Sequence, residues 1–151
     1  MEEFIYNSLS MKKKLIELDE FDQGPRNIMN YGHSFGHAIE SATDYGIPHG
    51  IAVTIGMDIA NFVATELGVS SISHFERMHN VLNKNCKTYR HVSINVDSLL
   101  NALSKDKKNS TSQLRLILPD KSGRIGIGLY DNNERLKKSL EKYFEIYGMD
   151  N

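Results

Sequence analysis

The sequence has little cysteine, which could cross-link the chain, and little proline, which could bend it. It also has no large excess of positive or negative charge. Its 151 residues include one cysteine, three prolines and no tryptophan. The single cysteine, Cys86, excludes an internal disulfide and fits a reducing compartment. Because 18 basic residues balance 19 acidic ones, net charge gives no reason to expect nucleic acid or an anionic membrane as a partner.

Long apolar runs and a leader peptide are also lacking. The most apolar stretch, residues 51–67, contains Asp58 and Glu66 and is too short to span a bilayer comfortably. The N-terminal residues, MEEFIYNSLSMKKK, lack the basic, apolar and small-residue regions that a signal peptide presents in order. We therefore expect a cytoplasmic protein without a membrane or nucleic-acid partner.

What the sequence contains predicts one mainly α domain over residues 1–151, with a small β-hairpin. Hydrophobic residues make up 40% of the chain and charged residues 25%, which is an ordinary globular composition with enough length for a real core. Helical periodicity predicts helices over residues 2–18, 26–45, 51–67, 73–85, 96–105 and 132–147. Residues 113–130 (QLRLILPDKSGRIGIGLY) instead alternate apolar and polar side chains around a central turn, which is typical of a β-hairpin.

The stretch NYGHSFGHAIESATDYGIPHG, residues 30–50, gathers three of the six histidines. His33 and His37 are four residues apart and would share one face of a helix. His49 precedes the next predicted helix, and an antiparallel return would bring it alongside the other two. Neutral imidazole is a common ligand of zinc-like ions, so His33 with His49, or His33 with His37, could hold a metal.

The same predicted helix face carries groups that suit an anionic substrate. Asn30 lies one turn before His33, and Arg26 lies a turn earlier again. A cation and an amide aligned with histidines suit an oxygen-rich anion, and Gly32 and Gly36 would let it approach closely. The alternative is a packed helical domain in which the glycines and histidines serve only packing. A zinc peptidase is disfavoured because Ser34, not glutamate, follows His33.

Three blocks of the sequence resemble the 3-dehydroquinate synthase family. RNIMNYGHSFGHAIESATDYGIPHGIAVTIGM is similar to its signature, R-x-x-L-N-x-G-H-T-x-G-H-A-x-E followed by H-G-E-A-V-x-x-G-M. KKKLIELDEFDQGPR and SKDKKNSTSQLRLILP resemble the blocks before and after it. The resemblance runs in order from Lys12 to Leu118, and related sugar-phosphate cyclases that make deoxy-inosose or valiolone precursors share these blocks.

The resemblance implies that two domains together supply the ligands of the metal site. The family joins an N-terminal Rossmann-like NAD-binding domain to a C-terminal helical domain, and this chain matches only the second, since it has no glycine-rich strand–turn–helix for a pyrophosphate. Of three metal ligands in the family, one is a glutamate of the N-terminal domain. His33 and His49 match the other two, and the ion is zinc or cobalt. His37 matches a non-ligand active-site histidine for proton transfer or hydrogen bonding, and Glu40 would orient a histidine.

Other matched positions are implied to bind the substrate. Lys12, Arg26 and Asn30 match contacts to its carboxylate, hydroxyl or phosphate oxygens. Lys107 and Lys108 match a block in which one lysine approaches the substrate. One departure stands beside a metal ligand, because Ile51 occupies the position of the family's glutamate in H-G-E. The remaining histidines match no block and are interpreted as surface or structural residues: His74, His79 and His91.

The activity that the resemblance implies belongs to a larger assembly. It is a lyase reaction of the shikimate pathway that leads to aromatic amino acids, with a sugar phosphate as substrate. NAD transiently oxidises a ring hydroxyl, phosphate is eliminated, and an intramolecular aldol reaction closes a carbocycle. We expect the isolated chain to be inactive without a Rossmann-like partner domain in cis or trans, and family members are commonly homodimers. The alternatives are a non-catalytic stand-alone or truncated domain, or part of a related cyclase.

Overall fold

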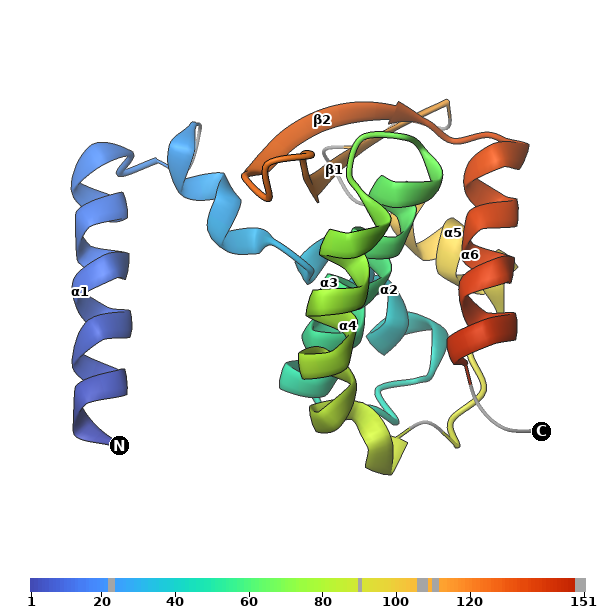
Figure 1. Ribbon diagram of the computed structural model, residues 1–151, viewed down its shortest axis with the longest axis horizontal. Helices are drawn as coiled ribbons and strands as arrows, with labels where there is room; N and C mark the ends of the chain where they lie inside the picture. The colour runs from blue at the N-terminus through green and yellow to red at the C-terminus, as the bar shows by residue number, and fades with distance from the viewer. Residues whose placement is uncertain (22–23, 90, 106–108, 110–111, 149–151) are drawn as a thin grey trace.

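The computed structural model describes residues 1–21, 24–89, 91–105, 109 and 112–148, and it is a helical body with one β-hairpin (Figure 1). The elements in chain order are α1 (Glu2–Leu18), the 3₁₀ helix η1 (Pro25–Asn30), α2 (His33–Ala42), α3 (His49–Glu66), α4 (Ile72–Cys86), the 3₁₀ helix η2 (Lys87–Tyr89), α5 (Val96–Ser104), β1 (Gln113–Pro119), β2 (Ile125–Asp131) and α6 (Glu134–Tyr147). The predicted fold class, mainly α with a small hairpin, is confirmed.

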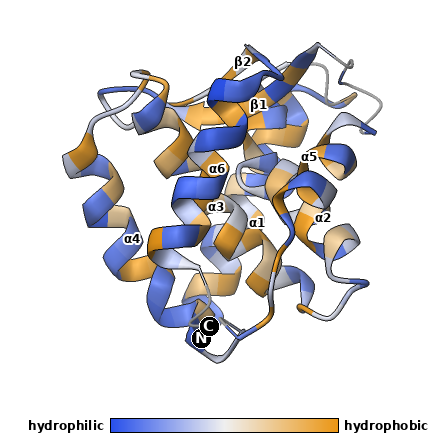
Figure 2. Ribbon diagram, turned by 90° about the vertical axis from the view of Figure 1, so that its right-hand side faces the viewer, coloured by the Kyte–Doolittle hydropathy of each residue, from blue (hydrophilic) through white to orange (hydrophobic). Residues whose placement is uncertain are grey.

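Helix α3 is the central element of the body. It is apolar on nearly every side, and α2, α4, α6 and β1 pack around it. Ile59, Ala60 and Val63 of α3 are fully buried. The surrounding helices are amphipathic, as the alternating colours of α4 in Figure 2 show, so each buries one face against α3. Gly68, with a φ of 78°, ends the helix in the left-handed conformation that favours glycine.

The hairpin closes one end of the body. β1 and β2 pair antiparallel, with Leu116 opposite Gly128, and the strands lie above the helices in Figure 1. Leu114, Leu116 and Leu118 of β1 are buried, whereas β2 remains largely accessible to solvent. A two-stranded sheet is marginally stable in water by itself, so the hairpin depends on the packing of the β1 leucines against the rest of the body.

The prediction of a single helix over residues 26–45 is wrong. The chain forms the short η1, turns at Gly32 with a φ of 80°, and begins α2 at His33. At Gly32 a side chain would lie 2.8 Å from the carbonyl oxygen of Val53, so close packing against α3 requires a glycine here and allows the positive φ. Asn30 and Arg26 therefore belong to a different element from His33 and do not extend its helix face.

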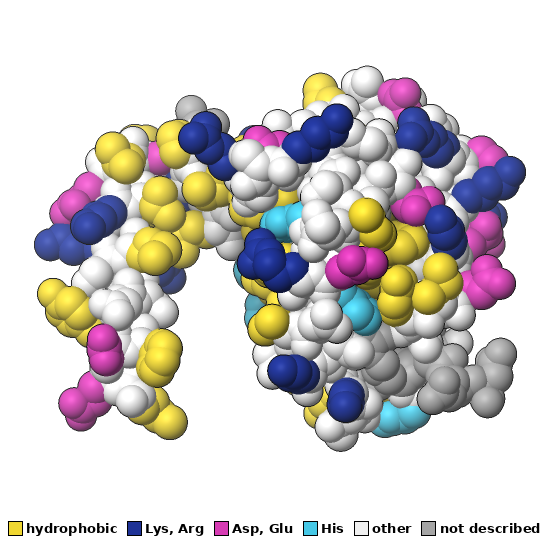
Figure 3. Space-filling model, viewed as in Figure 1, with side chains coloured by type: hydrophobic (Ala, Val, Ile, Leu, Met, Phe, Trp, Pro, Cys, Tyr) yellow, Lys and Arg dark blue, Asp and Glu magenta, His cyan; other side chains and the backbone are white. Residues whose placement is uncertain are grey.

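Helix α1 forms as expected but stands apart from the body. It has no buried residue, and Figures 1 and 3 show it as an arm joined to the rest through η1. Most of its apolar side chains are exposed, among them Phe4, Tyr6 and Leu9 at 79%, 71% and 61%. In the described part of the chain, no helix combines the length and the hydropathy needed to cross a bilayer.

Candidate metal and substrate site

The three histidines of residues 30–50 come together where α2 begins beside the start of α3. His33 is the first residue of α2, His37 lies one turn further, and His49 is the first residue of α3. Their ring centres form a nearly equilateral triangle, with separations of 5.6 Å between His33 and His37, 5.5 Å between His33 and His49, and 5.6 Å between His37 and His49. The antiparallel return predicted from the sequence thus places all three at one point.

Glycines allow the two helices to approach this closely. A side chain on Gly36 would lie 3.0 Å from Cα of Val53, and one on Gly56 would lie 2.7 Å from the backbone nitrogen of Gly36. Real Cβ atoms essentially never come as close to backbone atoms as the one on Gly56 would, so this position needs glycine, and a side chain at Gly36 would be tight against Val53. The close contact between the helix backbones sets the spacing of the histidines on α2 and α3.

That spacing fits one bound ion. A zinc-bound imidazole nitrogen lies about 2.0–2.1 Å from the metal, and the ring centre roughly 1.1 Å beyond, so two imidazoles on one tetrahedral ion have ring centres roughly 5 Å apart. The observed separations of 5.5 and 5.6 Å are close to this value. The ring separations therefore suit a divalent metal held by two of these histidines.

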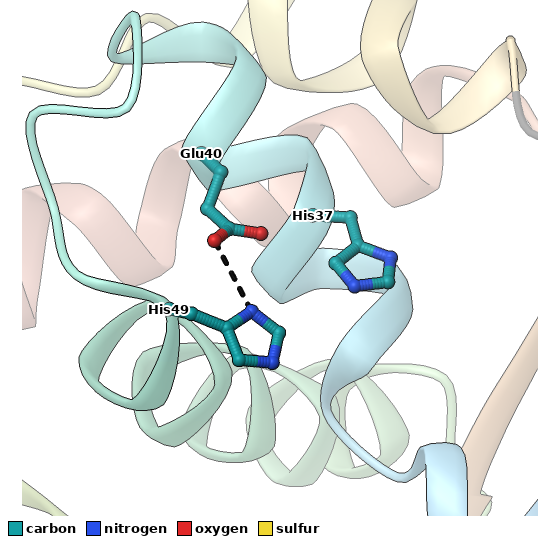
Figure 4. A group of neighbouring side chains, drawn as sticks. All are labelled: His37, Glu40 and His49. Atoms are coloured by element: carbon teal, nitrogen blue, oxygen red, sulfur yellow. Dashed lines mark hydrogen bonds and ion pairs between the residues drawn. The ribbon is translucent and has the colours of Figure 1, made fainter.

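His33 and His49 each have one ring nitrogen held by an oxygen. Nδ1 of His49 lies 3.1 Å from Oε1 of Glu40 (Figure 4), and Nδ1 of His33 lies 3.4 Å from the carbonyl oxygen of Tyr31. When Nδ1 donates to such an oxygen, the proton is fixed there and Nε2 keeps its lone pair, as is usual for metal-bound histidines. Glu40 is thus placed to orient a histidine, as the sequence predicts.

The electrostatics of His33 also favour its neutral form. Burial lowers the pKa of His33 below its ordinary value, and the neighbouring rings of His37 and His49 lower it further, against the opposing effect of the Tyr31 carbonyl. A neutral imidazole is the form that binds a metal.

His37 differs from the other two histidines. No hydrogen bond to its ring is found among the described residues. One nitrogen of His37 lies within 4.8 Å of donor atoms of both Glu40 and His49, so these three form the one three-ligand donor set that the described residues bring this close, and His33 is not part of it. Figure 4 shows His37 on the same side of α2 as Glu40.

A cavity of about 170 Å³ adjoins the histidines. Its lining comes from η1, the first turns of α2, and β1. The residues are Asn27, Asn30, His33, Ser34, His37, Arg115 and Ile117. Asn30 therefore lines the same cavity as His33 and His37, although it does not belong to their helix.

The other predicted substrate contacts are not gathered here. Nη1 of Arg26 donates to the carbonyl of Glu20 at 2.9 Å, and the residue does not line the cavity. Lys12 is exposed on the isolated α1. Lys107 and Lys108 lie outside the described residues. Ile51, at the position of the family's glutamate, packs against the hydrophobic core.

The cavity residues that were not predicted as site residues include Asn27 and Arg115. Nη1 of Arg115 donates to Oδ1 of Asn27 at 3.2 Å, across 88 residues of chain. The sequence signal for Arg115 was a charged residue between Leu114 and Leu116, in a strand whose leucines the structure shows to be buried. Asn27 gave no signal, because the predicted continuous helix made it an ordinary surface amide.

Two unmatched histidines have structural roles, as the sequence suggests. Nδ1 of His79 lies 2.7 Å from Oδ2 of Asp58, a carboxylate buried to 1% exposure, and the hydroxyl of Tyr143 donates to the same oxygen at 2.7 Å. Nε2 of His74 lies 3.2 Å from Oδ1 of Asn61. His91 is exposed.

The chain is similar in sequence to proteins of one known family. The family model described as 3-dehydroquinate synthase C-terminal matches residues 1–109. A 3-dehydroquinate synthase of Helicobacter pylori (strain P12) is 36% identical over 144 residues, which are 95% of this chain and 42% of that protein. One of Prochlorococcus marinus (strain MIT 9312) is 39% identical over 131 residues, covering 86% of this chain and 36% of that protein.

A solved structure shares the fold. It is a 2-deoxy-scyllo-inosose synthase complexed with carbaglucose-6-phosphate, NAD⁺ and Co²⁺, with a TM-score of 0.80 and 26% sequence identity. The match covers 93% of this chain and 41% of the other. The chain thus spans about two fifths of the length of the proteins it matches.

Proposed function

The chain belongs to the 3-dehydroquinate synthase family, in the C-terminal part that the family model describes, and from this membership we propose that it forms the metal- and substrate-binding part of a cyclase. The complete enzyme, with a Rossmann-like NAD-binding domain in cis or trans, would eliminate phosphate from a sugar phosphate and close a carbocycle. The shikimate-pathway substrate is favoured because the relatives of 36% and 39% identity are 3-dehydroquinate synthases.

One observation carries the proposal: His33 and His49 stand 5.5 Å apart, ring centre to ring centre, on two different helices. Each offers Nε2 while an oxygen holds its Nδ1. We assign these two as metal ligands and Glu40 as the acceptor that orients His49. When bound, a zinc or cobalt ion would supply Lewis-acid polarisation of substrate oxygens, and NAD would supply reversible oxidation of a ring hydroxyl.

His37 has a separate role in this proposal. Its ring faces the cavity and has no hydrogen-bond partner among the described residues, so either nitrogen can exchange a proton with a bound substrate. Asn30 would hydrogen-bond a substrate oxygen from η1, which lines the same cavity. When the partner domain is in place, the site would also include Lys12, Arg26 and one of Lys107 and Lys108. The complete enzyme would form the homodimer that is usual in the family.

Cobalt titration tests the metal assignment on the chain alone. The visible absorption of Co²⁺ bound to nitrogen ligands should appear with the wild-type chain and disappear with His33→Ala and with His49→Ala. His37→Ala should retain it, and His91→Ala, at an exposed position, serves as the matched control. Loss of the spectrum with His37→Ala but not with His33→Ala would instead identify the His37–Glu40–His49 set as the site.

Reconstitution tests the activity. The N-terminal half of a related synthase is added with NAD and a divalent metal, and phosphate release is measured from a heptulosonate phosphate and from glucose 6-phosphate. Release from the first supports a dehydroquinate synthase, and release from the second a deoxy-inosose synthase. A chain that binds no cobalt and releases no phosphate with either substrate would falsify the proposal and favour a non-catalytic domain.

A further inference from the structure

Arg115 is the one cation of the described residues that lines the cavity beside the histidines. It is the third residue of β1, between the buried Leu114 and Leu116. The side chain reaches toward η1, so the cavity has Arg115 on one wall and His33 and His37 on another. A positive charge is therefore built into the space where the proposed function places the substrate.

The guanidinium is held in position at its far end. Nη1 donates to Oδ1 of Asn27 at 3.2 Å, and Asn27 itself is buried to 1% exposure. The bond to Asn27 uses one N–H of the guanidinium and leaves its other N–H groups available. A planar group fixed in this way loses little freedom when it binds a ligand.

The backbone of Arg115 is anchored as well. Its N–H donates to Oδ1 of Asn109 at 2.6 Å, and Nδ2 of Asn109 donates to the carbonyl of Leu103 at 2.7 Å. Asn109 follows directly on the predicted substrate lysines, Lys107 and Lys108. Arg115 thus connects the segment before β1 with η1, and both of these segments carry predicted substrate contacts.

The charge of Arg115 is not neutralised within the described chain. The ion pairs of the described residues involve other cations, and no described carboxylate lies within 4.0 Å of the guanidinium. A partly buried cation without a counter-ion is unfavourable, and arginine with free parallel donors matches the geometry of phosphate and carboxylate oxygens. Packing of β1 onto η1 alone would be satisfied by a neutral amide donor.

We propose that Arg115 binds an oxyanion of the substrate in this cavity, a phosphate or a carboxylate group. The inference rests on the proposed function for the identity of the substrate but not for the binding of the anion. The guanidinium donates two N–H groups to the anion while Nη1 keeps its bond to Asn27. It holds one charged end of the substrate beside His37 and the metal ligands.

Binding of simple anions to the chain tests the proposal. Backbone amide signals of the wild-type chain are followed by NMR during titration with inorganic phosphate and, separately, with malonate, at constant ionic strength. Shifts should localise to Arg115, Asn30 and Ser34, and the tighter of the two anions shows whether phosphate or carboxylate is preferred. Arg115→Gln keeps a donor for Asn27 and should weaken binding at least tenfold, whereas Arg115→Lys should weaken it less.

Controls separate this outcome from misfolding and from failure of the proposed function. Arg124→Gln, at an exposed position in the hairpin turn, should bind the anion as the wild type does, and an unchanged thermal midpoint establishes that each variant is folded. Equal anion affinity for wild type and Arg115→Gln, or no localised binding of either anion by the wild type, overturns the proposal. Failure of cobalt binding with anion binding intact would reject the metal assignment and leave Arg115 as an anion-binding residue.

Discussion

Gly56, in the middle of α3, faces the carbonyl group of Gly32 so closely that no side chain fits between them. This contact fixes the position of α2 against α3, and with it the distance between the histidines on the two helices.

Replacing Gly56 by alanine should therefore damage both stability and metal binding. The new methyl group would overlap backbone atoms of Gly32 and Gly36, which cannot rotate away as a side chain can. We expect the free energy of unfolding to fall by about 3 kcal/mol, measured by urea denaturation, and cobalt affinity to fall with it. Gly50→Ala on the same helix is the matched control, because nothing lies within 4 Å of its added methyl. A Gly56→Ala variant as stable as Gly50→Ala would contradict this packing.

The hydroxyl of Tyr143 should contribute measurably to stability. It donates to the buried carboxylate of Asp58 at 2.7 Å, and a hydrogen bond to a charged group is worth roughly 1.5–3 kcal/mol. Tyr143→Phe should lower the free energy of unfolding by about 2 kcal/mol. Tyr130→Phe, whose hydroxyl has no partner among the described residues, should change it by less than about 0.5 kcal/mol. Equal losses for the two variants would show that the Asp58 contact contributes nothing.

His74 should make stability depend on pH in a defined direction. Burial lowers its pKa, and the neighbouring Arg77 lowers it further. Between that lowered pKa and the ordinary value near 6.5, the unfolded chain binds a proton that the folded chain does not, so the free energy of unfolding rises with pH across this window. Urea denaturation between about pH 5 and 7 should show a shallower rise for His74→Gln than for the wild type, and His91→Gln should leave the rise unchanged. Parallel curves for wild type and His74→Gln would rule out this contribution.

The apolar side chains of α1 should promote association without supporting the fold. Phe4 and Leu9 are 79% and 61% exposed, and such patches mark surfaces that another protein covers. Phe4→Lys with Leu9→Lys should reduce self-association of the isolated chain in sedimentation experiments while the thermal midpoint stays the same. A lowered midpoint would mean that these side chains are buried in solution.

Much of the fold was predictable because hydrophobic periodicity is a local property. Helix α1 has the bounds that its pattern gives, and the alternating leucines of β1 identify the hairpin. The break at Gly32 was not predictable in the same way. It depends on the contact of Gly32 with Val53 of α3, and a local pattern carries no information on such a contact.

The candidate site likewise has a part that local sequence predicts and a part that depends on contacts between residues distant in sequence. The meeting of His33, His37 and His49 follows from two neighbouring helices and was predicted. The place of Arg115 opposite Asn27 depends on where the hairpin lies on the helices, 88 residues later in the chain. Arg26 was expected to point with Asn30 and His33 along one helix, and the turn after η1 removes that alignment.

The separation between Asn27 and Arg115 also has a consequence for the order in which the site is built during folding. The histidine triangle uses residues 33–49 and closes a short loop, whereas the cavity wall needs β1. Closing a longer loop costs more chain entropy, and contacts distant in sequence form more slowly. On the ribosome, α2 and the start of α3 emerge well before the hairpin, so a nascent chain would acquire its proposed metal ligands first and the complete cavity beside them only when synthesis has passed β2.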